Sequence, residues 1–265
     1  MEDFHGRVAV VTGASSGLGR AIAVELASRG ACAVAVNFSR SALEAEETAD
    51  LIRKKGAEPL LVQADVSDDG GCRAIAEAVT AYGRVEALFN NAGKTKFAND
   101  HADLDAVSGD DFLQLYSVNV VGAFQMIRAL RPLLEACEAP GAVVNTSSIA
   151  GVVGIGSSVP YAASKGALNT MTLSLARALA PKIRVNAVCP GFIDTPWFGR
   201  ALEAQQLERM RAGVAERTPL KVVSQAEDIA AAAVFLASPA SRHVTGETLL
   251  VDAGSHLGYA PLAAR

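Results

Sequence analysis

Short apolar runs alternate with helical segments along nearly the whole chain, and this alternation restricts the fold more than any other feature. The strand-like runs fall at residues 7–11, 31–37, 59–63, 87–90, 142–146, 183–188 and 248–251. Helical patterns fill the intervals at residues 18–29, 41–55, 69–82, 110–137, 158–179 and 224–237. Strands that are apolar throughout are buried on both faces, and repeated βα units form parallel sheets. The sequence therefore predicts an α/β fold with a doubly wound parallel sheet and helices on both faces.

Glycine and polar residues mark several boundaries of these segments. Gly30 and Gly56 follow helical segments, at the place where glycine ends a helix in the left-handed conformation. The run Ser224-Gln225-Ala226-Glu227 has the pattern of a capping box and is expected to open the helix that ends at Ala237. No linker, low-complexity tract or internal repeat divides the 265 residues, so a single domain spanning residues 1–265 is expected.

Composition and charge exclude several classes of function. The net charge is only −4 and no basic cluster is present, which argues against a nucleic-acid partner. No signal peptide is visible, and no apolar stretch approaches the length of a membrane span, so a cytoplasmic protein without a membrane partner is expected. The cysteines and histidines are scattered without metal-ligand spacing: Cys32, Cys72, Cys137, Cys189, His5, His101, His243 and His256. No metal site is expected.

Tyr161 and Lys165 form the pair with the clearest chemical meaning. Residues four apart lie on the same face of a helix, one turn from each other. A free phenol has a pKa of about 10, and a nearby ammonium group favours the phenolate and lowers that pKa. The pair is a candidate for acid–base catalysis, although such pairs also occur in structural networks.

Gly13, Gly17 and Gly19 stand at the junction of the first strand and the first helix. Glycine permits a tight turn and close backbone approach there, and a helix N-terminus favours an anion. The spacing T-G-x-x-x-G-x-G differs from the common dinucleotide fingerprint G-x-G-x-x-G. The turn is interpreted as the site of a dinucleotide pyrophosphate, with simple packing of helix on strand as the alternative.

Several ordered motifs resemble the short-chain dehydrogenase/reductase family, and the likeness extends from Gly6 to Gly254. They are the glycine motif, Asn90-Asn91-Ala92-Gly93, Ser148, Tyr161-x-x-x-Lys165 and Pro190-Gly191. The resemblance implies a Rossmann-type, seven-stranded sheet, a nicotinamide cofactor and a homotetramer assembled through residues 110–137, residues 158–179 and the last strand. Within the family, the 3-oxoacyl-[acyl-carrier-protein] reductases are of similar length.

The resemblance also implies which residues contact the cofactor. They are Gly13, Ser15, Ser16, Gly17, Leu18, Gly19, Asn37, Arg40, Asp65, Val66, Asn91, Ala92, Gly93, Tyr161, Lys165, Pro190, Gly191, Ile193 and Thr195. Asn37 replaces the carboxylate that would bind the adenosine ribose and repel a 2′-phosphate, and Arg40 can pair with that phosphate. Ser16, in contrast, stands where NADP-preferring members often carry a basic residue. NADP(H) is favoured, and NAD(H) is the alternative.

The family mechanism assigns four residues to catalysis. By resemblance, Tyr161 exchanges a proton with the substrate oxygen, and Lys165 lowers the pKa of Tyr161 and holds the nicotinamide ribose. Ser148 donates a hydrogen bond to the substrate oxygen, with the neighbouring Ser147 as the alternative if the strand register differs. Asn119 would help to hold a water in the proton relay.

The substrate region is predicted less sharply. Phe192, Trp197, Phe198 and Val153 are candidate substrate contacts, and Phe192 fits core packing equally well. A helical lid is expected at about residues 192–217. Residues 99–109 are expected to form an acidic surface loop.

Three functional hypotheses remain open from the sequence. The first is an NADP(H)-dependent oxidoreductase that reduces a ketone, with a 3-oxoacyl thioester as one candidate substrate. The second is an NAD-dependent alcohol, sugar or steroid dehydrogenase, and the third is a cofactor-binding sensor or scaffold without turnover. Halohydrin dehalogenases lose the glycine motif, and enoyl reductases of the family separate tyrosine and lysine more widely, so both fit this chain less well.

Overall fold

A single parallel sheet of seven strands organises the computed structural model, which describes residues 3–98, 100–199 and 203–258. The strands run in the order β3-β2-β1-β4-β5-β6-β7. Their bounds are β1 Val8–Val11, β2 Ala33–Phe38, β3 Glu58–Gln63, β4 Ala87–Asn90, β5 Gly141–Thr146, β6 Ile183–Pro190 and β7 Thr248–Val251. The order reverses between β1 and β4, which confirms the predicted doubly wound, Rossmann-type sheet.

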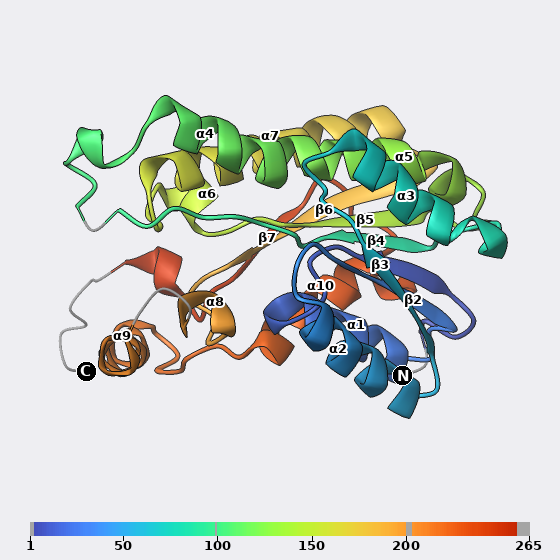
Figure 1. Cartoon of the computed structure of the whole chain (residues 1–265), viewed down its shortest axis with the longest axis horizontal. Helices are drawn as coiled ribbons and strands as arrows, with labels where there is room; N and C mark the ends of the chain where they lie inside the picture. Colours follow the sequence, from blue (N-terminus) through green and yellow to red (C-terminus); the bar gives the residue numbers. More distant parts are fainter. Residues whose placement is uncertain (1–2, 99, 200–202, 259–265) are drawn as a thin grey trace.

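Helices cover both faces of this sheet (Figure 1). One layer contains α3 (Asp69–Ala78), α4 (Gly109–Tyr116), α5 (Ala123–Glu135), α6 (Ala150–Val153) and α7 (Val159–Leu179). The other contains α1 (Gly17–Ser28), α2 (Ala42–Lys54) and α10 (Ala226–Ala237), while α8 (Pro196–Gly199) and α9 (Ala204–Arg217) lie at one end of the sheet. Among the described residues, no helix is both long enough and apolar enough to cross a bilayer.

Burial falls from the centre of the sheet to its edges. Every residue of β1, β2, β4 and β6 is buried, whereas the edge strands β3 and β7 are only partly covered. Successive side chains of a strand point to opposite faces, so each central strand contributes side chains to two apolar cores, one on each face of the sheet. Because both faces of these strands are buried, their sequences are mostly apolar and do not alternate regularly with polar residues.

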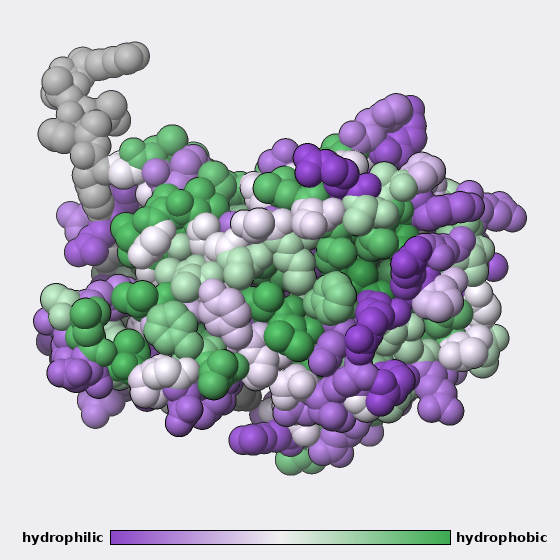
Figure 2. All heavy atoms as spheres, turned by 90° about the horizontal axis from the view of Figure 1, so that it is seen from above, coloured by the Kyte–Doolittle hydropathy of each residue, from purple (hydrophilic) through white to green (hydrophobic). Residues whose placement is uncertain are grey.

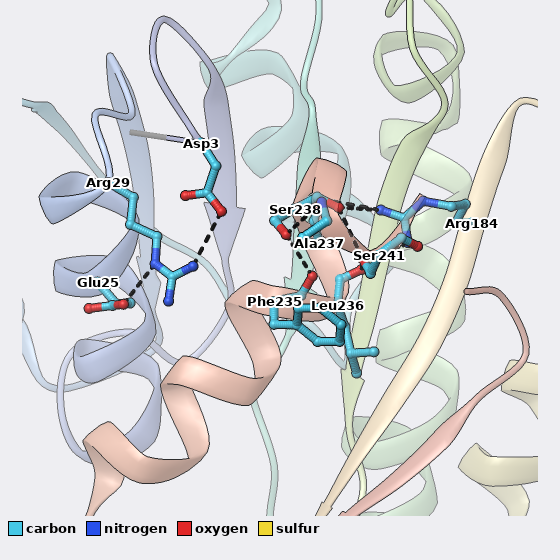
Figure 3. Close-up of polar contacts among 10 residues, drawn as sticks. Asp3, Glu25, Arg29, Arg184, Phe235, Leu236, Ala237, Ser238 and Ser241 are labelled. Atoms are coloured by element: carbon cyan, nitrogen blue, oxygen red, sulfur yellow. Dashed lines mark hydrogen bonds and ion pairs between the residues drawn. The ribbon is translucent and has the colours of Figure 1, made fainter. Parts of the chain in front are cut away.

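A buried cation fixes the end of α10 to the sheet. The guanidinium of Arg184, on β6, donates hydrogen bonds to the carbonyl oxygens of Leu236, Ala237, Ser238 and Ser241 (Figure 3). It also donates to the Val244 carbonyl. These carbonyls belong to the last turn of α10 and the chain that follows it, where unpaired acceptors and the helix dipole favour a positive charge. Arg184 therefore satisfies acceptors that would otherwise be buried without partners.

Some helix boundaries differ from the sequence prediction. The segment 110–137 is not one α-helix, because a π-helical turn at Ser117–Gly122 separates α4 from α5. The wider turn places Asn119 in the interior, where its side chain binds backbone groups of Lys94. Gly30 and Gly56 do adopt left-handed conformations after their helices, as predicted.

The predicted capping box at Ser224 was wrong by one residue. The N-cap of α10 is Gln225, whose side chain and that of Asp228 form the reciprocal box. Ser224 instead pairs with Ile193 as a parallel bridge and accepts a hydrogen bond from the Asp194 N–H. That tertiary contact draws Ser224 out of the cap.

Candidate active site

A cavity of about 760 Å³ opens at the carboxyl ends of the strands and brings most of the predicted site residues together. The predicted residues on its wall are Gly13, Ser15, Ser16, Gly17, Leu18, Arg40, Asn91, Ala92, Gly93, Ser148, Tyr161, Lys165, Pro190, Gly191, Phe192, Ile193, Thr195 and Trp197. Gly19, Asn37, Asp65, Val66, Asn119 and Val153 do not line it. The cavity extends from the glycine turn to Ser148 and Tyr161.

The glycine turn is packed too tightly for side chains. A Cβ atom on Gly19 would lie 2.3 Å from the Gly13 carbonyl oxygen and 2.5 Å from Nδ2 of Asn91. Gly13 has φ +61°, and a Cβ there would lie 2.9 Å from Cα of Ala92. Gly19 therefore acts from behind the cavity wall, by letting α1 approach the turn.

Hydrogen bonds join this turn to the chain after β4. Nδ2 of Asn91 donates to the carbonyls of Thr12 and Gly13, at 3.0 and 3.1 Å. Oγ1 of Thr12 accepts from the N–H groups of Asn91 and Ala92, both at 3.0 Å. The two loops on either side of the switch point between β1 and β4 therefore form one unit.

The first turn of α1 faces the cavity without a side-chain cap. Ser16 is the N-cap, and its side chain makes no capping hydrogen bond. Arg20, which the sequence analysis did not single out, donates to the Ser15 carbonyl and to Glu44 and Thr48 around α2. The N–H groups at this helix N-terminus are a suitable site for a phosphate.

The two residues predicted to select the adenosine half lie in different surroundings. Asn37 is buried, accepts from the Gly13 N–H and donates to the carbonyls of Val62 and Ala64. Its amide group therefore braces the glycine turn against β3 and takes no place on the cavity wall. Arg40 is exposed on that wall, and its guanidinium makes no hydrogen bond or ion pair with another described residue.

Asp65 and Val66, in the loop after β3, do not line the cavity. Asp65 accepts hydrogen bonds from the N–H and hydroxyl of Ser67, and these bonds lower the pKa of its carboxyl. Val66 is buried, and its carbonyl lies where a Cβ on Gly122 would come within 2.9 Å. Both residues hold the loop after β3, and their predicted contact with the cofactor stays a prediction.

Ser148 and Tyr161 come together across the cavity, from the loop after β5 and from α7. Tyr161 is partly accessible, and the surrounding protein raises the pKa of its phenol to about 12, while a hydrogen bond from Ser148 acts in the opposite direction. Ser147 is buried, and its hydroxyl donates to the Lys165 carbonyl at 3.2 Å. The structure therefore favours Ser148 over Ser147 as the hydroxyl beside Tyr161.

Lys165 is buried beneath the tyrosine. Its Nζ donates to the Thr146 carbonyl at 2.7 Å and lies 5.7 Å from the centre of the Tyr161 ring. Burial lowers the pKa of its ammonium to about 8. Burial outweighs the ammonium of Lys165, because the pKa of Tyr161 is raised and not lowered as the sequence predicted.

Asn119 contacts protein groups on every side. Its Oδ1 accepts from the Lys94 N–H at 2.8 Å, and its Nδ2 donates to the Lys94 carbonyl and to Oγ of Ser164. It is buried and does not reach the cavity wall. Its position supports the loop after β4, and its predicted role in a water relay stays a prediction.

Two of the predicted substrate contacts line the cavity, and Val153 does not. Val153 is the last residue of α6 and does not line the cavity, because Gly154 (φ +73°) reverses the chain and brings Ile155 to the wall instead. Phe192 and Trp197 do line it. The side chain of Phe198 lies outside the described residues.

Sequence reasoning missed part of the apolar wall on the lid. Met210 and Val214, one turn apart on α9, line the cavity, as do Phe97 and Ile155 from two loops. Their i, i+4 spacing in the predicted lid helix was the available signal. The cavity therefore has a polar, hydrogen-bonded half at the glycine turn and a mainly apolar half under α9.

Comparisons with known proteins agree with this geometry. Residues 13–256 match the family described as Enoyl-(Acyl carrier protein) reductase. Ketoacyl reductase 2 of the granaticin polyketide synthase from Streptomyces violaceoruber is 42% identical over 252 residues, which are 94% of this chain and 96% of that protein. The 3-oxoacyl-[acyl-carrier-protein] reductase FabG of Staphylococcus aureus is 36% identical and covers 94% of this chain and 98% of its own length.

A solved structure shows the same fold. A short-chain dehydrogenase/reductase from Burkholderia xenovorans has a TM-score of 0.86 and 39% sequence identity, and the match covers 95% of this chain and 98% of that one. Fold, ordered motifs and relatives lead to one conclusion: the chain is an oxidoreductase of the short-chain dehydrogenase/reductase family.

Proposed function

We propose that the protein is an NADP(H)-dependent ketoreductase that transfers a hydride between the nicotinamide and a carbonyl carbon. The observation that carries the proposal is the single cavity in which the open first turn of α1, the exposed Arg40 and the Ser148–Tyr161 pair share one wall. A dinucleotide needs the first two features, and carbonyl chemistry needs the third.

The residues present fit such a cofactor. The uncapped turn of α1 suits a pyrophosphate, and Gly93 leaves space beside Lys165, because a Cβ on Gly93 would lie 3.8 Å from the lysine Nζ. Pro190, Gly191, Ile193 and Thr195 would flank the nicotinamide. When bound, the nicotinamide supplies or accepts the hydride.

Tyr161 supplies the proton of the reduction. Because burial raises the pKa of the Tyr161 phenol, the phenol keeps its proton at neutral pH and has it available for the carbonyl oxygen. Ser148 donates a hydrogen bond to the oxygen on which negative charge develops. Lys165, held by the Thr146 carbonyl, is placed to bind the ribose hydroxyls and to stabilise the phenolate left after proton transfer.

Arg40 supports the preference for NADP(H). Its guanidinium pairs with no side chain in the described part of the chain and stands on the wall next to Ser39 and Ser41, and no carboxylate stands on β2 to repel a 2′-phosphate. A guanidinium binds phosphate through charge-assisted hydrogen bonds. NAD(H) remains the alternative, and comparing turnover with NADPH and NADH distinguishes the two cofactors.

A 3-oxoacyl thioester is the substrate class that we favour. Two of the relatives bear ketoacyl or oxoacyl reductase names, and an apolar wall at Ile155, Met210 and Val214 suits an acyl chain. The description of the matching family includes enoyl reduction, but Tyr161 and Lys165 keep the four-residue spacing that brings them onto one helical face beside Ser148.

The test is cofactor oxidation, NADPH beside NADH, with acetoacetyl coenzyme A and a small panel of ketones. Tyr161→Phe serves as the blank. Turnover with NADPH that disappears in the variant supports the proposal. Turnover confined to alcohols with NAD would favour the dehydrogenase hypothesis, and tight cofactor binding without turnover across the panel would favour a sensor or scaffold.

We also propose that the protein assembles as a homotetramer. Figure 2, which views the layer of α4, α5 and α7 from above, shows apolar side chains gathered over its middle. Leu113, Val121, Phe124 and Leu173 are between 43% and 70% exposed in these helices and the π-helical turn. Contiguous exposed apolar surface favours association. A monomer in sedimentation equilibrium would contradict this proposal.

A further inference from the structure

The lid helix α9 forms part of the cavity wall with little apolar burial to hold it. Met210 and Val214 line the cavity, yet no residue of α9 is buried. Its capping box joins Glu203 and Gln206 within the first turn of the helix and does not connect α9 to another element. Short helices in water depend on tertiary contacts for their stability, so another interaction must fix α9 in place.

An ion pair joins the middle of α9 to the segment that follows β6. Nη2 of Arg211 lies 2.9 Å from Oδ1 of Asp194, whose side chain is 21% exposed. The second partner of Arg211 is Glu208 on the same helix, at 3.3 Å and 72% exposed. Of the two contacts, only the pair with Asp194 connects the lid to another element.

Asp194 is a rigid anchor for this pair. Its N–H donates to the Ser224 carbonyl at 2.9 Å, and the preceding residue, Ile193, forms a parallel bridge with Ser224. Both neighbours of Asp194, Ile193 and Thr195, line the cavity. The ion pair therefore connects α9 to a segment that forms part of the cavity wall.

The far end of α9 leads into a turn that contacts the chain after β7, where the Leu220 N–H donates to the Ala253 carbonyl at 3.3 Å. Thr218 is buried, and its hydroxyl donates to the Val222 carbonyl while accepting from the Val222 N–H. Lys221 in this turn has φ +57°, a left-handed conformation that is uncommon in residues other than glycine. The turn at Thr218–Val222 can therefore act as a pivot, with Arg211 two helical turns away.

We propose that Asp194 and Arg211 form a latch that holds α9 closed over the cavity and so positions Met210 and Val214 against the substrate. They are positioning residues, since neither is placed to touch the reacting atoms. The role in substrate binding rests on the proposed function, whereas the closed position of the lid does not.

Trp197 allows the latch to be tested without any substrate. It is the only tryptophan of the sequence, lies on α8 between Asp194 and α9, and is 39% exposed on the cavity wall. Acrylamide, an uncharged quencher, would measure its accessibility in Asp194→Asn, Arg211→Met and Glu208→Gln. The last variant is the matched control, because it removes only the exposed partner of Arg211.

We expect quenching to increase in Asp194→Asn and Arg211→Met and to stay at the wild-type value in Glu208→Gln. The double variant Asp194→Asn/Arg211→Met should resemble either single variant, because both remove the same contact. Wild-type quenching in the near-isosteric Asp194→Asn, with native circular dichroism, would overturn the latch. Equal increases in all three variants would also overturn it.

Kinetics with NADPH and acetoacetyl coenzyme A then test the consequence. The KM for the thioester should rise about fivefold in Asp194→Asn with kcat nearly unchanged, as loss of a partly exposed ion pair biases the lid toward opening. Arg211→Lys should restore part of the affinity. A fall in kcat at unchanged KM would contradict the positioning role. Absence of turnover in the wild type would reject the proposed function and leave the quenching result to decide the latch.

Discussion

The two halves of the cavity are held by different kinds of interaction. At the glycine turn, buried strands, glycines without room for a Cβ and the Asn91–Thr12 hydrogen bonds fix the backbone from several directions. Under the lid, α9 has no buried residue and depends on an ion pair and one anchored turn. A site that binds one cofactor and admits a separate substrate combines a rigid half with a half that can open.

The largest expected effect concerns the chemistry at the border of the two halves. Tyr161→Phe removes the proton donor and leaves the ring in place, so turnover should fall by a factor of about 10³. Affinity for NADPH, measured by nucleotide fluorescence, should change little. Wild-type turnover in this variant would remove Tyr161 from the mechanism.

Gly19→Ala tests the rigid half. The added Cβ would collide with the Gly13 carbonyl and Nδ2 of Asn91, so the free energy of unfolding should fall by about 3 kcal/mol and cofactor binding should weaken. Gly109→Ala is the control, since nothing lies within 4 Å of its Cβ position. Urea denaturation compares the two, and equal effects would show that packing at the turn is not tight.

Lys165→Met tests the cost of burying a cation in the rigid half. Below pH 8 the lysine is protonated in both states, and its folded pKa of about 8 against 10.5 unfolded destabilises the folded protein by roughly 3 kcal/mol. The variant without cofactor should therefore be more stable at pH 7. Its advantage should shrink between about pH 8 and 10.5, where the folded wild type has lost the proton that the unfolded chain retains.

The control for that experiment is Lys182→Met, which changes an exposed lysine. Thermal unfolding of both variants and the wild type across this pH range isolates the buried group. A stability difference that does not depend on pH would show that burial does not lower the pKa of Lys165.

Arg40→Ala tests the adenosine end of the cavity. Loss of a charge-assisted contact with a 2′-phosphate should weaken NADPH binding about tenfold, while NADH binding should stay nearly the same. Calorimetric titration with both cofactors measures the ratio. Equal losses for the two would mean that Arg40 does not contact the 2′-phosphate.

The smallest expected effect is in the lid. Gly213 lies inside α9 with nothing within 4 Å of its Cβ position, so Gly213→Ala should stabilise the helix by about 1 kcal/mol. Hydrogen exchange of the α9 amides should become slower, while the exchange of β1 and β4 should not change. Unaltered exchange in α9 would show that helix propensity does not limit lid opening.

Local patterns in the sequence were enough to predict the sheet, the glycine turn and the Tyr161–Lys165 pair. Each depends on residues near one another in the chain: apolar runs that two helical layers bury, glycines that allow a close turn, and side chains one helical turn apart. For the same reason the ends of β4 and β7 were predicted to the residue. The relatives confirm the family that these motifs indicated.

Only the tertiary structure decided how distant side chains share their hydrogen bonds. The side chain of Asn37 points inward because it donates to carbonyls of β3 and of the loop that follows. Ser224 pairs with Ile193 and is not the N-cap that the sequence predicted. Ile155 replaced Val153 on the wall because Gly154 turned the chain. Local sequence specifies which groups are available, whereas the packing of segments far apart in the chain determines which partners they meet.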